Sequence, residues 1–437
     1  MKSPSFISGG FSFFSPPGVS LSLTDSVLVP HFPISSIEDS SNPVEFVISS
    51  TVADPFIDFS NSYLYVKFHA TITDKDGERN IQDGDNISLV NNFFHSLTSG
   101  IDIFLQETLV DSQVNQNSAY RSYFQSLINY SEGDKEQTLT EEGFYKDTAT
   151  HFDKMNGTNN TGFYKRKQLL LHGKKVVCVG KPGVALFSSN RFMIPGVNLR
   201  LRFCLSKPEF FFLGEGRKPI NLHLDEMVLY LRKVTPTPNI RIAIEDELLQ
   251  SKALYPVTET SIKTYSIPQK TNNFSLDNLI SGRMPREIII GFVHTDAYLG
   301  KVHLNPFNFK HYDLSRIDFT VNGRVLPPCP LTDEDSSYSR TYRLFLESAG
   351  VLQESHSNIG VTRSDFCGGN FLLFFNLTPD LSQNDHNNPI FENIRTGNAR
   401  LDLTFKSETT ENVTLICYQT FDKVYSISYD RNVSIDI

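Results

Sequence analysis

The sequence predicts an all-β protein built from two similar β-sandwich halves. Many short runs alternate apolar and polar residues and are separated by Gly, Pro and Asp-Gly turns, a pattern typical of a sandwich or jelly roll. Phenylalanine is abundant at 35 residues whereas tryptophan is absent, and aromatic side chains favour half-buried strand surfaces. Two features then recur about two hundred residues apart. This recurrence favours a duplicated architecture over a single sandwich.

The first recurring feature is an alternating strand that leads into an amphipathic helix. Within residues 101–130, Ile101, Ile103 and Leu105 fall on one face, as a half-buried strand requires. After a polar break, Asn117-Ser118 offers a helix cap. Apolar residues then recur three and four positions apart, which predicts a helix; they are Tyr120, Tyr123, Phe124, Leu127 and Ile128.

The same order returns in residues 317–350. Apolar residues alternate again, Asn322-Gly323 predicts a hairpin turn, and a second helix over 338–346 is expected to end at Gly350. A second echo lies downstream of each copy. Its alternating runs are 196–203 and 397–405, and each precedes a long strand-like run, 222–234 or 413–427. Two pairs in the same order predict two halves of the same topology, because chance would rarely repeat both.

Residues 1–40 predict an N-terminal arm. The arm is rich in Ser, Pro, Phe and Gly and carries few charges. Its rings at Phe6, Phe11, Phe13 and Phe14 are therefore expected to be buried against the body or a neighbouring subunit. The first half then spans 41–236, and its strand-like runs are 44–51, 63–73, 101–110, 168–179, 184–188, 198–206 and 222–234.

Thr235-Pro-Thr-Pro238 is the predicted boundary between the halves, since two prolines cannot sit inside a central strand. The second half, 237–437, is expected to begin with a short helix over 243–250. Its strand-like runs are 261–267, 287–293, 317–325, 370–377, 399–406 and 413–428. Two polar segments, 131–162 and 378–397, are expected to project from one end of the sandwiches as exposed loops that form the outward surface.

Bulk properties exclude several classes of protein. A net charge of −9 argues against a nucleic-acid-binding domain, although it leaves room for a local basic patch. The chain has no apolar run long enough for a membrane span. Pro4, Pro16 and Pro17 interrupt the amino terminus, so synthesis in the cytosol without a signal peptide is expected. The cysteines lack any CxxC pair and predict free thiols; they are Cys178, Cys204, Cys329, Cys367 and Cys417.

Several longer motifs stand out along the chain: Pro43–Val47, Tyr63–Lys67, Val90–Leu97, Tyr145–Ala149, Asn305–Tyr312 and Asn376–Leu381. They closely resemble motifs of the major capsid proteins of Polinton/Maverick elements and the related adintoviruses, and the resemblance runs from about residue 20 to residue 430. It implies a double jelly roll, that is, two tandem eight-stranded jelly-roll β-sandwiches with short flanking helices.

The resemblance also implies a function. By this resemblance the chain is expected to be a major capsid protein located in the virion capsid. Three copies are expected to form a homotrimer, which is one pseudo-hexameric capsomer of an icosahedral shell. Expected partners are further copies, neighbouring capsomers, penton and minor capsid proteins and, without sequence specificity, the packaged genome. The apolar arm and the run Phe210–Leu213 are candidates for the surface between subunits. No enzymatic activity, cofactor or metal is expected.

Three histidines and an aspartate lie close in sequence and are candidate metal ligands: His294, Asp296, His303 and His311. Their spacings contain neither HxH nor HExxH, so loop histidines are the favoured interpretation. Asp74-Lys-Asp-Gly77 resembles the start of a calcium loop. Asp85 stands where such a loop carries glutamate, however, which favours a hairpin turn.

Other sequence signals permit alternatives. The basic runs Lys165–Lys167 and Lys174-Lys175 are candidate genome contacts, although a solvated face is the commoner reason for such runs. Ile7–Phe11 resembles the sites cut by adenovirus-type proteases, with Gly10 and Phe11 as candidate processing residues, but a flexible hinge is favoured. No GxSxG or GxxxxGK[ST] motif is present. The alternative function is a carbohydrate-binding or carbohydrate-active β-sandwich, which needs an aromatic platform or a carboxylate pair in a cleft.

Overall fold

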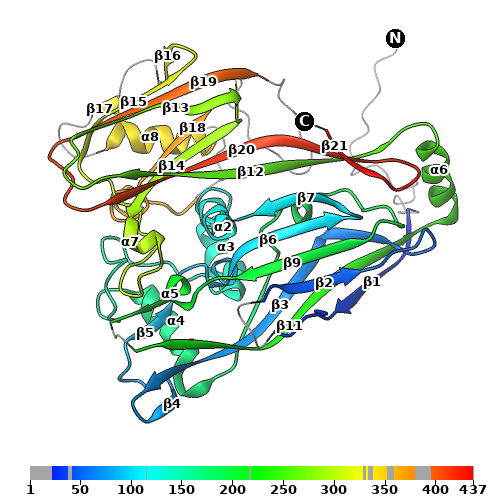
Figure 1. Cartoon of the computed structure of the whole chain (residues 1–437), viewed down its shortest axis with the longest axis horizontal. Coiled ribbons are helices and arrows are strands. Elements are labelled where there is room, and N and C mark those ends of the chain that lie inside the picture. Colours follow the sequence, from blue (N-terminus) through cyan, green and yellow to red (C-terminus); the bar gives the residue numbers. More distant parts are fainter. Residues whose placement is uncertain are drawn as a thin grey trace, which may run out of the picture.

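A computed structural model describes residues 22–37, 42–114, 116–215, 218–327, 331–332, 338–351, 359–378 and 395–436. Its strands fall into two stacked sandwiches, the first in the lower part of Figure 1 and the second in the upper part. The arm residues before Ser22 and most of the predicted loop 378–397 lie outside the described residues.

The first sandwich contains two main sheets, with strand orders β1-β11-β3-β8 and β2-β9-β6-β7. Strand β4 extends the first sheet beyond β3, and β5 pairs with β10 in a small separate sheet. The strands are β1 Leu23–His31, β2 Val44–Ile48, β3 Phe56–Asp74, β4 Gly77–Asn80, β5 Ile87–Leu89, β6 Thr98–Leu105, β7 Thr108–Gln113, β8 Val176–Gly180, β9 Leu199–Leu205, β10 Phe212–Gly214 and β11 Ile220–Pro236.

The second sandwich repeats this arrangement with the strand orders β12-β20-β14-β18 and β13-β19-β15-β16. Strands β17 and β21 add to β15 and β20. The strands are β12 Ala253–Ile267, β13 Asn273–Arg283, β14 Glu287–His294, β15 Leu314–Val321, β16 Arg324–Val325, β17 Leu331–Thr332, β18 Leu372–Asn376, β19 Thr396–Phe405, β20 Val413–Ile427 and β21 Val433–Asp436. Two facing four-stranded orders per sandwich make each half an eight-stranded jelly roll, so the predicted fold class is confirmed.

Helices occupy the connections. Most of them gather between the two rolls on one side of the molecule, whereas α6 lies at the opposite end (Figure 1). They are α1 Phe93–Ser96, α2 Asn117–Ile128, α3 Glu132–Glu136, α4 Thr161–Leu170, α5 Pro208–Phe211, α6 Pro238–Leu248, α7 Thr295–Tyr298, α8 Ser339–Ser348 and α9 Arg363–Cys367, with 3-10 turns η2 Thr138–Glu142, η3 Leu171–Gly173 and η4 Ala185–Ser188.

The recurring sequence features occupy equivalent positions in the two rolls, which confirms the predicted common topology. The alternating strands are β6 and β15, and the downstream echoes are β9 with β11 and β19 with β20. Helices α2 and α8 follow equivalent strands, and the residue before each, Gln116 or Tyr338, has a positive φ. Helix α8 is followed at Gly350 by a φ of +71°, a left-handed stop that glycine adopts without a Cβ clash.

The chain passes from one roll to the other near the predicted boundary. Strand β11 ends at Pro236 and α6 starts at Pro238, where a proline fits the first helical turn because no N–H is needed there. The helix expected over 243–250 therefore starts five residues earlier. Within the described residues, every strand pairing joins strands of the same roll.

Some sequence predictions were wrong. The predicted arm 1–40 includes β1, which pairs with β11; β1 is largely exposed on both faces, so it lacks the alternation that marks a half-buried strand. The run 184–188 is the turn η4 rather than a strand, and its consecutive residues Ala185, Leu186 and Phe187 are all buried. The run 168–179 begins inside helix α4 and becomes strand only at Val176.

Candidate functional site

A buried ion pair lies where the first roll meets the second, in a contact region that we call the junction. Arg166 of α4 and Asp147 are both fully buried, with 2.5 Å between Nη2 and Oδ1. Asp147 also accepts hydrogen bonds from Asn160 Nδ2 at 2.9 Å and from Asn305 Nδ2 of the second roll at 3.0 Å. The Arg166 Nε donates to the Leu89 carbonyl at 2.8 Å. One carboxylate therefore holds a cation of the first roll and an amide of the second.

The motif 305–312 extends this junction with aromatic packing. Phe307 is fully buried and stacks on Tyr123 of α2 with ring centroids 4.5 Å apart and planes at 13°. Phe309 lies 5.2 Å from Phe124 of the same helix. The Tyr123 hydroxyl donates to Asn370 Oδ1 at 2.9 Å. The apolar face predicted for α2 thus packs against the second roll, and the sequence alone did not reveal this partner.

Part of the segment 131–162 also belongs to the junction, so the expectation that the whole segment is an exposed loop was wrong. Leu139, Phe144 and Phe152 are buried. Asp153 accepts hydrogen bonds from the main-chain N–H of Asn305 at 2.9 Å and from Asn308 Nδ2 at 2.6 Å. Some of its polar side chains, such as Asp147 and Asp153, satisfy main-chain and amide groups of the second roll. Polarity alone cannot distinguish that role from contact with water.

Lys135 of α3 is a buried amine in the same region. Its Nζ donates to the carbonyls of Leu127 at 3.3 Å and Ile359 at 2.5 Å. Burial lowers the pKa of Lys135 from 10.5 to about 8. The chain therefore holds this cation in the native state at neutral pH against a desolvation cost.

We expect Lys135 to make stability rise with pH in the alkaline range. Between about pH 8 and 10.5 the unfolded chain binds more protons at this lysine than the folded chain, so this contribution to the free energy of unfolding increases with pH. Relative to Lys135→Met, the wild type should gain about 1.5 kcal/mol from about pH 8 to about pH 9.5 in urea titrations. Lys174→Met, at an exposed site, is the control. Parallel curves for wild type and Lys135→Met would contradict the assignment.

Two of the candidate metal residues, His294 and His311, have other partners. His294 Nδ1 accepts from the Asp296 main-chain N–H at 2.9 Å and caps α7. His311 contacts Asp313 and the Tyr338 hydroxyl, the latter at 3.2 Å. Within the described part of the chain, no three His, Cys, Asp or Glu side chains gather as metal ligands would. The stretch Asp74–Gly77 is the turn between β3 and β4, which confirms the predicted hairpin.

The three residues of the basic run Lys165–Lys167 differ in their burial and in their partners. Arg166 is committed to Asp147, and Lys167 is buried with its Nζ donating to the Asp83 carbonyl at 2.8 Å. Only Lys165 is exposed, so this run was wrongly grouped as one candidate genome contact. Lys174 and Lys175 are both exposed, and Lys175 pairs with Asp225 at 3.0 Å.

The run Phe210–Leu213 was wrongly predicted as an adhesive surface. All four residues are buried, and Phe210 lies 6.3 Å from Phe307 in the junction. The processing candidates Gly10 and Phe11, the arm phenylalanines and Cys329 lie outside the described residues. Four other cysteines are free thiols: Cys178, Cys204, Cys367 and Cys417.

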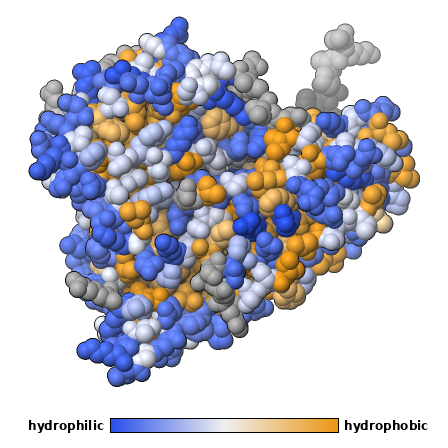
Figure 2. All heavy atoms as spheres, in the orientation of Figure 1, coloured by the Kyte–Doolittle hydropathy of each residue, from blue (hydrophilic) through white to orange (hydrophobic). Residues whose placement is uncertain are grey.

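An apolar band crosses the outer face of sheet β2-β9-β6-β7 instead. Cross-strand pairing aligns Val47, Arg200, Phe104 and Leu109 in one row. Val47 and Leu109 are 45% and 44% exposed, and the Arg200 guanidinium lies 4.1 Å from the centre of the Phe104 ring. Figure 2 shows the band on the face that Figure 1 presents. An exposed row of this kind is typical of a contact surface.

In the described ranges, none of the helices is both long and apolar enough to cross a membrane.

Comparisons with known proteins agree with the topology. No family model matches the chain. Among curated proteins, an uncharacterised protein of Caenorhabditis elegans, F54H12.2, is 24% identical over 410 residues, covering 90% of this chain and 93% of its own length.

Solved structures show the same fold at low sequence identity. A chain of the Sputnik virophage particle aligns with a TM-score of 0.69 and 13% identity, over 100% of this chain and 93% of its own. The mavirus major capsid protein aligns with a TM-score of 0.57 and 12% identity, over 100% of this chain and 96% of its own. The Faustovirus major capsid protein aligns with a TM-score of 0.57 and 8% identity, over 94% of this chain and 92% of its own. These similarities establish the double jelly-roll fold.

Proposed function

We propose that this chain is a major capsid protein, the structural subunit of an icosahedral viral shell. The observation that carries the proposal is the complete double jelly roll, with equivalent strand orders in both halves, which aligns over the whole chain with the mavirus major capsid protein. We further propose that it is of the Polinton/Maverick and adintovirus type, on the strength of the motifs described above. Its expected location is the virion capsid, and its role is structural rather than enzymatic.

Within this proposal the chain works as a homotrimer. Two rolls of equal topology give each subunit two similar edges, so three copies approximate six-fold symmetry and close by cyclic contacts. The rolls would be the units on either side of Thr235–Pro238, with the first beginning at β1. Neighbouring capsomers, penton and minor capsid proteins are the further partners proposed, with the genome as a contact without sequence specificity. The apolar band is proposed as a surface between copies.

We expect a charge within the apolar band to weaken trimers without unfolding the subunit. Leu109→Glu places a carboxylate on an exposed strand, where it costs little in the monomer but would be desolvated in an interface. Mass photometry should show full-length wild type as trimers and Leu109→Glu as monomers, and their far-UV circular dichroism spectra should match because the subunit stays folded. Leu299→Glu, at a site 69% exposed on the other roll, is the matched control.

The assembly proposal is refuted if the wild-type chain is monomeric at micromolar concentration and forms neither hexagonal capsomers nor shells in negative stain. The band alone is misassigned if Leu109→Glu and Leu299→Glu trimerise like the wild type. A truncation that tests the arm must stop before Leu23, because removing residues 1–40 also deletes strand β1.

The carbohydrate-binding alternative gains no support from the cavity at the end of the second roll. Among the lining residues that the structure describes, Asp422 is the one carboxylate, beside several arginines. Glycoside hydrolysis commonly uses a pair of carboxyl groups across the bond that is cleaved, and the described lining residues do not include such a pair.

A further inference from the structure

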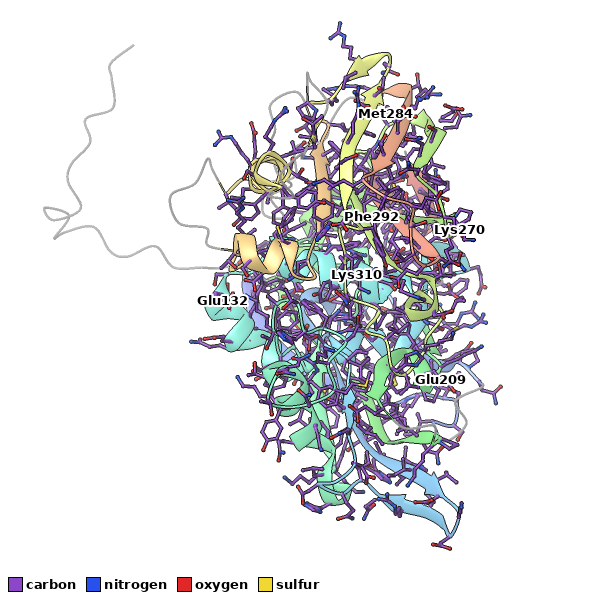
Figure 3. All side chains as sticks on the ribbon, turned by 90° about the vertical axis from the view of Figure 1, so that its left-hand side faces the viewer. Glu132, Glu209, Lys270, Met284, Phe292 and Lys310 are labelled. Carbon is purple, nitrogen blue, oxygen red and sulfur yellow. The ribbon has the colours of Figure 1, made fainter. Side chains whose placement is uncertain are left out.

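The cavity at the end of the second roll farthest from α7 has a volume of about 620 Å³, within the usual range for ligand sites. Separate segments of the roll converge on it: the β13–β14 turn, the β15–β16 hairpin, the residues before β19, and the middle of β20. Figure 3 labels Met284 from its lining in the upper roll, with Lys310 at the junction level and Glu209 in the lower roll. The cavity is therefore separate from the junction.

Arginine dominates the charge of this cavity. Among the described residues, its walls contain Arg283, Arg286, Arg324 and Arg395 and one carboxylate, that of Asp422. Four cations and one anion leave a formal charge of +3 among these lining residues, on a chain whose net charge is −9. Arg286 and Arg395 have interactions within the protein, so the charge open to a ligand lies with Arg283 and Arg324.

The guanidinium groups of the cavity differ in how many of their N–H groups bond to the protein itself. Arg286 is almost fully buried and lies 3.3 Å from Asp422 Oδ2. Arg283 donates through Nη2 to the Asp422 main-chain carbonyl, and its Cζ lies 5.4 Å from the centre of the Phe421 ring. The exposed Arg324 guanidinium makes no hydrogen bond or ion pair with any residue that the structure describes. Arg324 and the remaining N–H groups of Arg283 are thus available to a ligand.

Most of the other lining residues are apolar, with Asn322 and Thr378 as the polar exceptions. Met284, Leu377 and Phe421 form wall beside the arginines. Guanidinium forks match phosphate oxygens bidentately, while an aromatic ring and flat apolar surface accept a nucleobase by stacking. A ligand that uses both parts carries a phosphate joined to a planar organic group.

We propose that this cavity binds a nucleotide phosphate ester, either a free nucleotide or a unit of a single-stranded nucleic acid. Arg283 and Arg324 hold the phosphate, and the wall containing Phe421 holds the base. The proposal does not depend on shell assembly, since the cavity belongs to one roll of one chain.

Fluorescence anisotropy of labelled oligothymidylate with the full-length chain tests the site. Arg324→Gln should weaken binding about tenfold, the effect of losing one charge-assisted hydrogen bond, and should lower the slope of log affinity against log salt by about one. Adding Arg283→Gln should weaken binding further. Arg400→Gln is the matched control, because Arg400 lies on β19 outside the cavity lining and pairs with Asp402.

Competitors distinguish the two sources of the phosphate ester. Full competition by thymidine monophosphate supports a free nucleotide, and binding by the oligonucleotide alone supports a strand. Equal competition by inorganic phosphate overturns the role of the apolar wall. The site is also refuted if neither oligothymidylate nor thymidine monophosphate binds, or if Arg324→Gln, at its exposed hairpin, binds like Arg400→Gln with an unchanged melt.

Discussion

Replacing Asp147 with alanine is expected to destabilise the chain by about 3–5 kcal/mol, the usual result of leaving one partner of a buried ion pair alone. Arg166 would keep its buried charge without the carboxylate that lies 2.5 Å away. Asn160 and Asn305 would lose an acceptor at the same time. Urea unfolding monitored by circular dichroism measures the loss directly.

An exposed pair in the second roll provides the control. Arg400 and Asp402 are joined at 2.7 Å, but their side chains are 50% and 29% exposed. Asp402→Ala should therefore cost less than about 1 kcal/mol. Equal effects of Asp147→Ala and Asp402→Ala would show that the junction pair is not isolated from water. Asp147→Leu combined with Arg166→Met should recover part of the lost stability, since an apolar pair leaves no unpaired charge.

Phe307→Ala is expected to cost about 3–5 kcal/mol, because deleting a fully buried ring leaves a cavity that its neighbours fill only in part. The ring stacks on Tyr123 at 4.5 Å and meets Tyr120 edge-on at 5.6 Å. Because those tyrosines belong to the first roll, the loss should also loosen the coupling between the rolls. Scanning calorimetry should then resolve two transitions where the wild type shows one.

Phe32→Ala is the control, because it removes a phenylalanine ring that is not buried between the rolls. Phe32 is 64% exposed, and surface substitutions of this kind usually change stability by less than about 0.5 kcal/mol. If Phe307→Ala melts like Phe32→Ala, the motif 305–312 does not fasten the rolls together.

The strands with one buried face could be predicted from sequence. Strand β6 alternates because Ile101, Ile103 and Leu105 face the core while the residues between them are half-buried. Strand β1 could not be found in this way, since pairing with β11 rather than an apolar face defines it. Helix α4 was missed because it buries Arg166 and Lys167 as well as apolar residues, so its inward face does not look apolar.

The surfaces were harder to predict than the fold. Phe210–Leu213 resembled an adhesive run, yet it is core, whereas the exposed row containing Val47 and Leu109 arises only when four strands come into register. The arginine cavity likewise combines residues from Arg283 to Asp422. Its charge is dispersed along the sequence, so no local run signals it.

The junction has a consequence for biosynthesis. Helix α2 leaves the ribosome with Tyr123 and Phe124 on one face, but their partners Phe307 and Phe309 follow roughly 185 residues later. At the usual elongation rates of about 5–20 residues per second, that face waits on the order of 10–40 s for its cover. A nascent first roll therefore emerges with an aromatic surface open to chaperones and to other nascent chains. Slower translation would lengthen this exposure without altering the finished protein.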